Sequence, residues 1–450
     1  METLKAQNSI YDVIVIGAGA SGLLAAREAA SRGADCLLLE GLDMPGKKLL
    51  ATGNGRCNMG NMQMSPSYFR SRHPRFTEAI LSNWSPKALR QYWAELGLAT
   101  REEEGRVYPY SFRAESLHEV LVQSLRSVPC TLRCGQEVQA LRAKKALSLD
   151  REAGAIYHVG TKDGQVYRGR AVILATGGRA APKLGGLGTG YALYEGLGHR
   201  LVPQRPALVQ LCSRQVPRRF AGLRCRVELR LEAGRKAYVR EAGELLFTDY
   251  GLSGICVLNL SALVAEQLEQ GREPRLFIDF LPDLDEDQAL SYVQGLRRSQ
   301  GFRDAGLWGL SFLPAKISRF LYEERYQDLV RALGLSPRQL RRQQEYSLAD
   351  IGDDFVRRLI QLAKAWPCQI QGTRGFDFAQ VTDGGLDTRQ FNPYTLQSLL
   401  WPGLYACGEV LDVCGVCGGY NLHWAFASGI EAGRSAALLL HQEGRQTPLI

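Results

Sequence analysis

Hydrophobic positions near the N-terminus fall into two short runs with a helical pattern between them. Residues 11–16 (YDVIVI) are apolar and β-branched, as expected for a strand buried on both faces. Leu23, Leu24, Ala25, Ala26, Ala29 and Ala30 then recur at helical spacing, and the segment ends at Gly33. A second apolar run, residues 36–39, ends at Glu40. The pattern predicts a strand, a helix and a second strand, which is the start of an α/β fold.

The same kind of pattern returns later in the chain. Residues 171–174 form a strand-like run that leads into Ala175-Thr176-Gly177-Gly178, and residues 403–410 (GLYACGEV) join a short strand to a glycine and an acid. Small residues at helical spacing follow from 425 to 433. We therefore expect the first and last parts of the chain to build one domain together.

The middle of the chain has a different character. Segments 209–211, 224–231 and 236–239 read as strands, residues 276–280 as a further strand, and residues 285–342 as helical. We expect one domain from residues 1–190 and 370–450. An inserted β-rich domain is expected from residues 191–275 and 343–369, and a small helical domain from residues 276–342.

The first strand ends at a glycine-rich turn, Gly17-Ala18-Gly19-Ala20-Ser21-Gly22, which is a G-x-G-x-x-G sequence. Such glycines allow a tight turn and a close approach to a pyrophosphate, and the following helix directs unpaired N–H groups at the phosphate. Glu40 lies 21 residues beyond Gly19 and can accept from ribose hydroxyls. The ordered strand, glycines, helix, strand and acid predict a Rossmann-like dinucleotide-binding domain, and a glutamate at this place favours FAD.

Further glycine-rich segments support a flavin. Residues 45–58 (PGKKLLATGNGRCN) form a second glycine-rich, basic loop directly after the second strand, and Gly408-Glu409 is followed by Gly418-Gly419-Tyr420-Asn421-Leu422. A glycine and acid at a strand end, followed by a helix N-terminus, can bind the ribityl chain and the pyrimidine edge of a flavin.

These segments together resemble the bacterial flavoproteins of the YhiN/BaiN type, NAD(P)/FAD-dependent oxidoreductases. The resemblance rests on KKLLATGNGRCN (47–58), ELLFTDYGLSG (244–254), VTDGGL (381–386) and GEVLDVCGVCGGYNLHWAFASG (408–429), and it covers nearly the whole chain. It implies a GR2-type FAD-binding domain with an inserted β-rich domain and a small helical domain. The residues expected to bind FAD are Gly17, Gly19, Ala20, Ser21, Gly22, Glu40, Lys48, Gly53, Asn54, Gly55, Arg56, Cys57, Thr176, Gly177, Gly408, Glu409, Asn421 and Leu422.

Composition and charge narrow the function classes. The hydrophobic fraction of 45% excludes an intrinsically disordered protein, and no apolar run approaches the roughly 18 residues that span a bilayer. Eleven scattered cysteines favour reduced thiols in the cytoplasm over a disulfide framework. No second dinucleotide motif is evident, so we expect NAD(P)H to act as a transient reductant, and we expect no metal site.

The net charge of +9 is concentrated in the middle of the chain. Residues 201–250 hold ten basic and five acidic residues, and residues 297–342 hold ten basic and four acidic residues. One reading is an ordinary solvated surface, and the other is a surface for a polyanion such as RNA. The arginines proposed to contact substrate are Arg218, Arg219, Arg297 and Arg298, within a group that also includes Arg224, Arg226, Arg341 and Arg342.

The resemblance implies two competing substrates. One is a uridine of large-subunit ribosomal RNA, reduced to dihydrouridine by an enzyme that takes the base out of its stack. The other is a small molecule, through amine oxidation or through reduction of an unsaturated steroid or bile-acid intermediate. A flavin protein without enzymatic activity is a third possibility.

Two cysteines are candidate catalytic residues. Cys414-Gly415-Val416-Cys417 can be a redox dithiol, half of a zinc site, or simply packed beside the flavin. Cys417 precedes the GGYN segment and is the candidate general acid for reduction of a carbon–carbon double bond. Cys57 is equally near by motif and is the second candidate.

Overall fold

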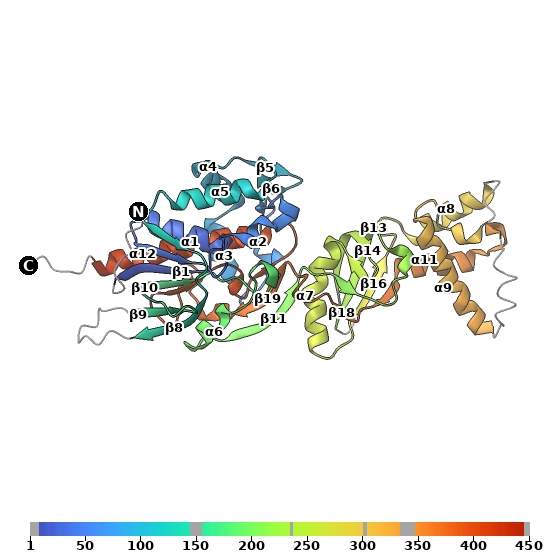
Figure 1. Ribbon diagram of the computed structural model, residues 1–450. Coiled ribbons are helices and arrows are strands. Elements are labelled where there is room, and N and C mark those ends of the chain that lie inside the picture. The colour runs from blue at the N-terminus through green and yellow to red at the C-terminus, as the bar shows by residue number, and fades with distance from the viewer. Residues whose placement is uncertain (1–8, 145–154, 235–236, 300–303, 334–346, 445–450) are drawn as a thin grey trace, which may run out of the picture. The chain divides into compact units, whose positions relative to one another are not determined.

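A computed structural model describes residues 9–144, 155–234, 237–299, 304–333 and 347–444 of the chain (Figure 1). The chain divides into two compact units, one from residues 1–207 and 375–450 and the other from residues 208–374. The first and last parts of the chain thus build the first unit together. The expected α/β class, with a parallel Rossmann-like sheet, an antiparallel sheet and additional helices, is confirmed.

The first unit is built on a seven-stranded sheet. Its strands run in the order β7-β2-β1-β10-β9-β8, and β20 also pairs with β10. The pairs among β7, β2, β1, β10 and β20 are parallel, whereas β9 and β8 join in antiparallel fashion. The strands are β1 (Ile10–Ile16), β2 (Cys36–Leu39), β7 (Cys130–Arg133), β8 (Val138–Lys144), β9 (Ile156–Thr161), β10 (Val166–Leu174) and β20 (Leu404–Ala406). Because β1, β10 and β20 are parallel, the loops that follow them meet at one edge of the sheet.

Helices cover this sheet, and two of them pack together closely (Figure 1). In α12 (Tyr420–Gly444), a Cβ at Gly429 would lie 2.3 Å from the backbone oxygen of Ser21 in α1 (Ala20–Ser31). The other helices of the unit are α2 (Lys47–Leu50), α3 (Phe76–Asn83), α4 (Pro86–Glu95), α5 (Ala114–Leu125) and α6 (Gly190–Glu195). Buried Glu28 of α1 accepts hydrogen bonds from Tyr92 of α4 at 2.7 Å and from Arg434 of α12 at 3.0 Å. These hydrogen bonds connect α1, α4 and α12.

Three small sheets complete the first unit. They pair β11 (Leu201–Ala207) with β19 (Val381–Leu386), β4 (Phe69–Arg70) with β21 (Cys414–Gly415), and β3 (Gly60–Asn61) with β6 (Arg106–Pro109) and β5 (Thr100–Glu103). The β11–β19 pair places residues up to 207 in the first unit. The unit therefore extends beyond the limit of residue 190 that we drew from the sequence.

The second unit holds an antiparallel sheet in the order β17-β16-β13-β14-β15-β12-β18. Its strands are β12 (Leu211–Cys212), β13 (Arg224–Gly234), β14 (Ala237–Phe247), β15 (Gly251–Ser253), β16 (Arg275–Asp279), β17 (Trp366–Gln369) and β18 (Gly372–Thr373). The sequence interpretation of residues 209–211 as a strand was wrong except for Leu211. The Val209 amide instead donates to the Ser261 hydroxyl at 3.2 Å.

The helices of the second unit share one core with its sheet. Those among the described residues are α7 (Ile255–Glu269), α8 (Glu286–Arg298), α9 (Ala315–Leu333) and α11 (Asp353–Lys364). Leu229 of the sheet, Val293 of α8 and Ile317 of α9 belong to the same buried cluster. The structure therefore divides the inserted region differently from the separate β-rich and helical domains that we expected. The helical pattern read over 285–342 is also interrupted after α8, and residues 334–342 lie outside the described part.

Candidate functional site

The glycine-rich turn after β1 has the shape that a dinucleotide needs. Gly17 has φ of +99°, and a Cβ there would lie 2.6 Å from the carbonyl oxygen of Ala175. A Cβ at Gly22 would lie 1.8 Å from the oxygen of Gly17, so both positions require glycine. A Cβ at Gly19, by contrast, would meet no heavy atom within 4 Å among the described residues, apart from its own chain neighbours. Helix α1 begins at Ala20 without a side-chain cap, so its first N–H groups face this open space.

Glu40 is held at the end of β2 by the turn itself. Its carboxylate accepts from the backbone N–H of Ala18 at 2.7 Å and from that of Leu42 at 2.9 Å. A carboxylate has about four lone-pair positions, so these two bonds orient Glu40 and leave acceptor capacity for ribose hydroxyls.

The second glycine-rich loop contributes a charge pair. The Nζ atom of Lys48 lies 2.8 Å from Oε2 of Glu409, which joins residues that are 361 positions apart in the chain. Gly53, Asn54 and Gly55 all have positive φ angles, at +56°, +54° and +81°. The loop after α2 therefore has an unusual left-handed course at the positions that the sequence predicted for the cofactor.

Arg56 lies against neighbouring aromatic rings. Its guanidinium stands over the rings of Tyr108 at 5.0 Å and Phe112 at 4.3 Å, and it lies 2.8 Å from the carboxylate of Glu103. These contacts hold the loop against β5 and β6. The prediction that Arg56 binds the cofactor has no support in this geometry.

The loop after β10 joins the same site. Thr382 of β19 accepts at its hydroxyl from the N–H groups of Arg179 and Ala180, at 2.8 and 3.1 Å. Its own N–H donates to Oε1 of Glu409 at 2.9 Å. A Cβ at Gly178 would lie 2.6 Å from that same Glu409 oxygen. Glu409 therefore links Lys48 to the Gly177–Gly178 turn.

The C-terminal motif, residues 408–422, also lies against the turn after β1. A Cβ at Gly408 would lie 2.4 Å from the Ser21 hydroxyl. The Asn421 side chain accepts from the Gly415 N–H and donates to the Gly415 oxygen, both at 2.8 Å, so it fixes the 414–417 loop. Leu422 packs against the hydrophobic core.

The residues present fit a bound dinucleotide. The hydroxyls of Thr176, which lies next to Gly17, and of Tyr191 in α6 are buried without a hydrogen-bond partner among the described residues. Cβ positions at Gly19, Gly55 and Gly177 meet open space, whereas those at Gly17 and Gly22 do not. Open backbone beside orphaned hydroxyls is the arrangement expected of a site for a polar ligand.

The two candidate catalytic cysteines lie in different surroundings. Cys57 is fully buried, and burial raises the pKa of its thiol to about 12. Cys417 is partly exposed, and burial raises the pKa of its thiol, opposed by the positive charge of Arg106. Cys414 is buried, and none of the eleven cysteines forms a disulfide. Cys417 is therefore the candidate that a substrate can reach.

A charged cluster beside Cys414 was missed at the sequence level. Asp383 of β19 is buried and lies 3.2 Å from Nε of Arg70 and 3.7 Å from Nη1 of Arg205. Arg70 is the register partner of Cys414 in the β4–β21 pair. The VTDGGL segment was the only sequence signal for Asp383. Nothing in the sequence pointed to Arg70 or Arg205, which reach the site only through strand pairing.

Many arginines of the inserted region are already paired with carboxylates. Arg219 pairs with Glu323, and Arg297 pairs with Asp353 and also bonds to the Ile351 oxygen. Arg224 and Arg226 pair with Glu244 and Asp283. Among the described residues, no carboxylate pairs with exposed Arg218 or Arg298, while Arg341 and Arg342 lie outside the described part. Exposed ion pairs weaken the predicted attraction for phosphate at Arg219, and Arg297 has a structural role.

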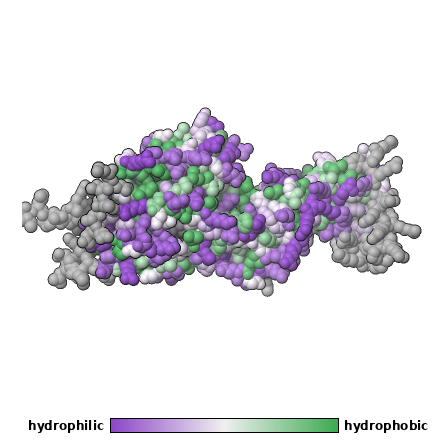
Figure 2. Space-filling view, viewed as in Figure 1, coloured by the Kyte–Doolittle hydropathy of each residue, from purple (hydrophilic) through white to green (hydrophobic). Residues whose placement is uncertain are grey.

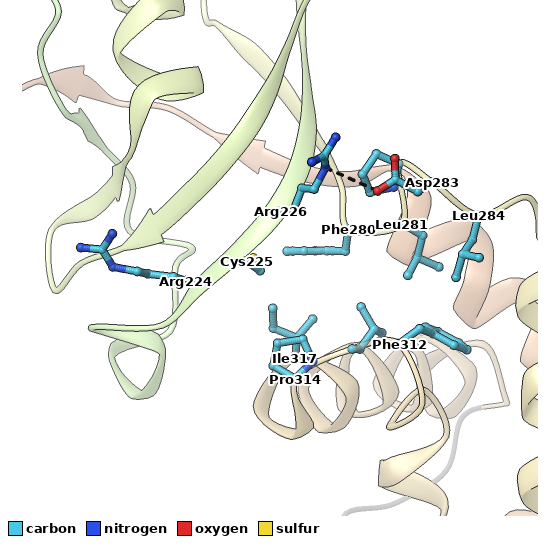
Figure 3. Close-up of a pocket in the computed structure, with 12 residues that line it drawn as sticks. Arg224, Cys225, Arg226, Phe280, Leu281, Asp283, Leu284, Phe312, Pro314 and Ile317 are labelled. Atoms are coloured by element: carbon cyan, nitrogen blue, oxygen red, sulfur yellow. Dashed lines mark ion pairs between the residues drawn. The ribbon is translucent and has the colours of Figure 1, made fainter. Parts of the chain in front are cut away.

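A pocket opens on the second unit (Figure 3). It has a volume of about 340 Å³, and its walls are mainly apolar, with Phe280, Leu281 and Ile317 among them. Arg226 and Asp283 form an ion pair at its edge. On the face of the molecule that Figure 2 shows, hydrophilic and hydrophobic residues are interspersed.

The described part of the chain has neither a metal-binding cluster nor a membrane-spanning helix. The described residues contain no group of three or more His, Cys, Asp or Glu side chains placed to hold a metal ion. Within the same part of the chain, no helix combines the length and the apolar character needed to cross a membrane.

Comparisons with known proteins identify the family of this chain. It matches the family described as HI0933-like protein Rossmann domain over residues 11–435. It is 36% identical over 426 residues to the 3-dehydro-bile acid delta(4,6)-reductase of Clostridium scindens, which covers 94% of this chain and 98% of that protein. It is 29% identical over 429 residues to the ribosomal RNA dihydrouridine synthase of Escherichia coli, covering 93% and 96%.

A solved structure is similar to this fold. The 3-ketosteroid delta1-dehydrogenase of Sterolibacterium denitrificans matches with a TM-score of 0.49 and 15% identity, covering 95% of this chain and 99% of that chain.

Proposed function

The chain belongs to the HI0933-like Rossmann-domain family, and from this premise we propose that it is an FAD-dependent oxidoreductase that reduces a carbon–carbon double bond conjugated to a carbonyl group. The observation that carries the proposal is the convergence of three segments at one sheet edge. The Gly17–Gly22 turn follows β1, the Gly177–Gly178 turn follows β10, and Glu409 follows β20 with Lys48 as its partner. Ligands of α/β sheets bind beyond the carboxyl ends of such strands.

The names of the two relatives share one chemical feature. Uracil carries a double bond conjugated to a carbonyl, and a 3-dehydro-delta(4,6) bile acid carries double bonds conjugated to its 3-oxo group. When such a bond is reduced, hydride adds to the carbon distant from the carbonyl, the electron pair moves to the carbonyl oxygen, and a proton adds to the adjacent carbon. Bound FAD, reduced transiently by NAD(P)H, supplies the hydride.

The residues of this chain then have four tasks. Gly17, Gly19 and the first turn of α1 bind the cofactor phosphates, while Glu40 binds the adenosine ribose. Lys48 and Glu409 position the flavin end of the cofactor. Cys417, kept protonated by its burial, delivers the proton to the substrate carbon. The free cysteines support a cytoplasmic location as part of this proposal.

We favour a small conjugated ketone as substrate. The bile-acid reductase is the more similar of the two relatives, and Arg219, Arg224 and Arg226 of the inserted region are occupied by carboxylates. Uridine in ribosomal RNA is the second candidate, because exposed Arg218 and Arg298 have no carboxylate partner among the described residues.

Anaerobic half-reactions test the proposed function. The purified protein should contain FAD that NADH or NADPH bleaches and that a 3-oxo-4,6-diene steroid acid reoxidises, with the saturated product identified by mass spectrometry. A protein that holds no flavin, or whose reduced flavin is reoxidised by neither substrate class, contradicts the proposal.

A matched RNA experiment separates the two substrates. Ribosomal RNA from cells without the gene is compared with RNA from cells that carry the wild type or an Arg218→Ala/Arg298→Ala variant. Unchanged dihydrouridine in all samples supports the small molecule. Loss of one dihydrouridine without the gene, restored by the wild type, assigns the RNA substrate instead.

A further inference from the structure

The hydroxyl of Tyr191 makes no hydrogen bond with any described residue of the protein. The Tyr191 side chain is 4% exposed, and its hydroxyl oxygen is buried without a hydrogen-bond partner among the described residues. A buried hydroxyl without a hydrogen bond destabilises the fold, so such groups are rare and call for an explanation.

The position of Tyr191 points to the dinucleotide turn. Tyr191 is the second residue of α6, and a Cβ at the preceding Gly190 would lie 2.0 Å from the hydroxyl oxygen of Thr176. Thr176 follows Ala175, whose carbonyl oxygen closes against Gly17. The Thr176 hydroxyl is likewise buried without a partner among the described residues. Two orphaned hydroxyls therefore lie near the edge of the sheet where the cofactor motifs meet.

The charges around Tyr191 keep it a hydrogen-bond donor. Burial raises the pKa of the Tyr191 phenol well above its usual value, and the negative charges of Glu409 and Asp412 act in the same direction. Arg179 opposes them with a smaller effect than that of Glu409. The group is therefore a neutral O–H at any physiological pH, and it can donate to an acceptor on a ligand.

We propose that the Tyr191 hydroxyl donates a hydrogen bond to an acceptor atom of bound FAD, with the Thr176 hydroxyl as a second contact beside it. The inference rests on the proposed function, because it requires that FAD occupy this site. We assign the cofactor rather than the substrate because Gly190, which precedes Tyr191, packs against Thr176, and Thr176 lies next to Gly17 of the phosphate-binding turn.

Tyr194 offers a matched comparison on the same helix. It is fully buried three residues after Tyr191, but its hydroxyl donates to the backbone oxygen of Tyr405. Its hydrogen bond is therefore complete within the protein. The Tyr191→Phe and Tyr194→Phe variants remove the same atom from neighbouring places with different partners.

The experiment measures two quantities for the full-length chain freed of cofactor: its thermal midpoint and its affinity for added FAD by flavin fluorescence. Tyr191→Phe should leave the thermal midpoint unchanged or raised and weaken FAD binding by about 3- to 10-fold, the effect of one hydrogen bond. Tyr194→Phe should lower the midpoint and leave the affinity within about 2-fold. Thr176→Val should behave like Tyr191→Phe.

Wild-type affinity for FAD in Tyr191→Phe overturns the inference while leaving the proposed function intact. So does a fall in its thermal midpoint equal to that of Tyr194→Phe, because that result shows a partner within the protein. A wild-type chain that binds no FAD contradicts the proposed function itself.

Discussion

Asp412 carries its proton at a higher pH than an ordinary aspartate because it lies almost entirely inside the protein. Its side chain is 4% exposed, and burial, assisted by the charges of Asp383 and Asp387, raises its pKa to about 6. The N–H of Arg72, which donates to its carboxylate at 2.6 Å, opposes the shift. The folded state therefore binds this proton more tightly than the unfolded state does.

The sign of the pH dependence follows from that difference. As pH rises from about 4, where an unfolded aspartate ionises, through about 6, the carboxylate must ionise inside the fold, and stability is lost. Asp412→Asn should thus raise the free energy of unfolding by roughly 1–3 kcal/mol at pH 8 and have little effect at pH 4. Urea titrations at the two pH values measure this, with exposed Asp377→Asn as control. Equal gains at both pH values would contradict it.

Cys417 is the residue whose removal tests proton delivery directly. Cys417→Ser should slow reoxidation of the reduced flavin by substrate about 10²-fold or more, which is the usual rate contribution of a general acid. It should leave the rate of flavin reduction by NAD(P)H unchanged. Stopped-flow absorbance separates the two half-reactions.

Cys414→Ser is the control, because Cys414 lies three residues earlier, in β21, and is buried. A wild-type rate in Cys417→Ser removes this thiol from the mechanism. Equal slowing of NAD(P)H-dependent reduction in both variants favours the redox dithiol instead.

At the scale of elements, the contact between α1 and α12 depends on small residues. A Cβ at Gly433 would lie 2.3 Å from the carbonyl oxygen of Ala25, and one at Gly429 would meet the oxygen of Ser21 at the same distance. A backbone oxygen cannot move aside as a flexible side chain can. An added Cβ at either glycine would therefore force α1 and α12 apart.

Gly433→Ala should lower the free energy of unfolding by about 1–3 kcal/mol, the usual cost of overpacking. Gly295, inside α8, is the control, because a Cβ there would meet no heavy atom within 4 Å among the described residues outside the backbone of α8. Gly295→Ala should stabilise the protein by up to about 1 kcal/mol through helix propensity. Denaturant unfolding of both variants checks the pair, and a stabilising Gly433→Ala would show that the helices can move apart.

At the scale of the whole molecule, each of the two units has a hydrophobic core of its own. All proposed FAD-binding residues belong to the first unit, residues 1–207 and 375–450. A ligand stabilises only the structure that binds it, by about 2.7 kcal/mol at a concentration 100-fold above its Kd.

Calorimetry should therefore resolve two transitions, of which added FAD raises one. Leu229→Ala, which opens a cavity in the second core, should lower the other transition. A single transition that both FAD and Leu229→Ala shift would show that the units unfold as one.

The local course of the cofactor-binding strands followed from the sequence alone. Short apolar runs with glycines between them predicted β1, α1 and β2, and the glycine turn and Glu40 fell at their ends as expected. These features depend on residues close together in the chain, whose hydrophobic period and backbone freedom are properties of the sequence itself.

Contacts between distant segments were decided only by the tertiary structure. The Lys48–Glu409 pair, the cluster of Arg70, Arg205 and Asp383, and the orphaned hydroxyl of Tyr191 depend on strand pairing and helix placement that no local pattern records. For the charge of the inserted region, the tertiary structure changed the interpretation that the sequence suggested. Its arginines read as a basic surface in the sequence, but folding set carboxylates beside many of them, because cross-strand and interhelical neighbours are chosen by the fold.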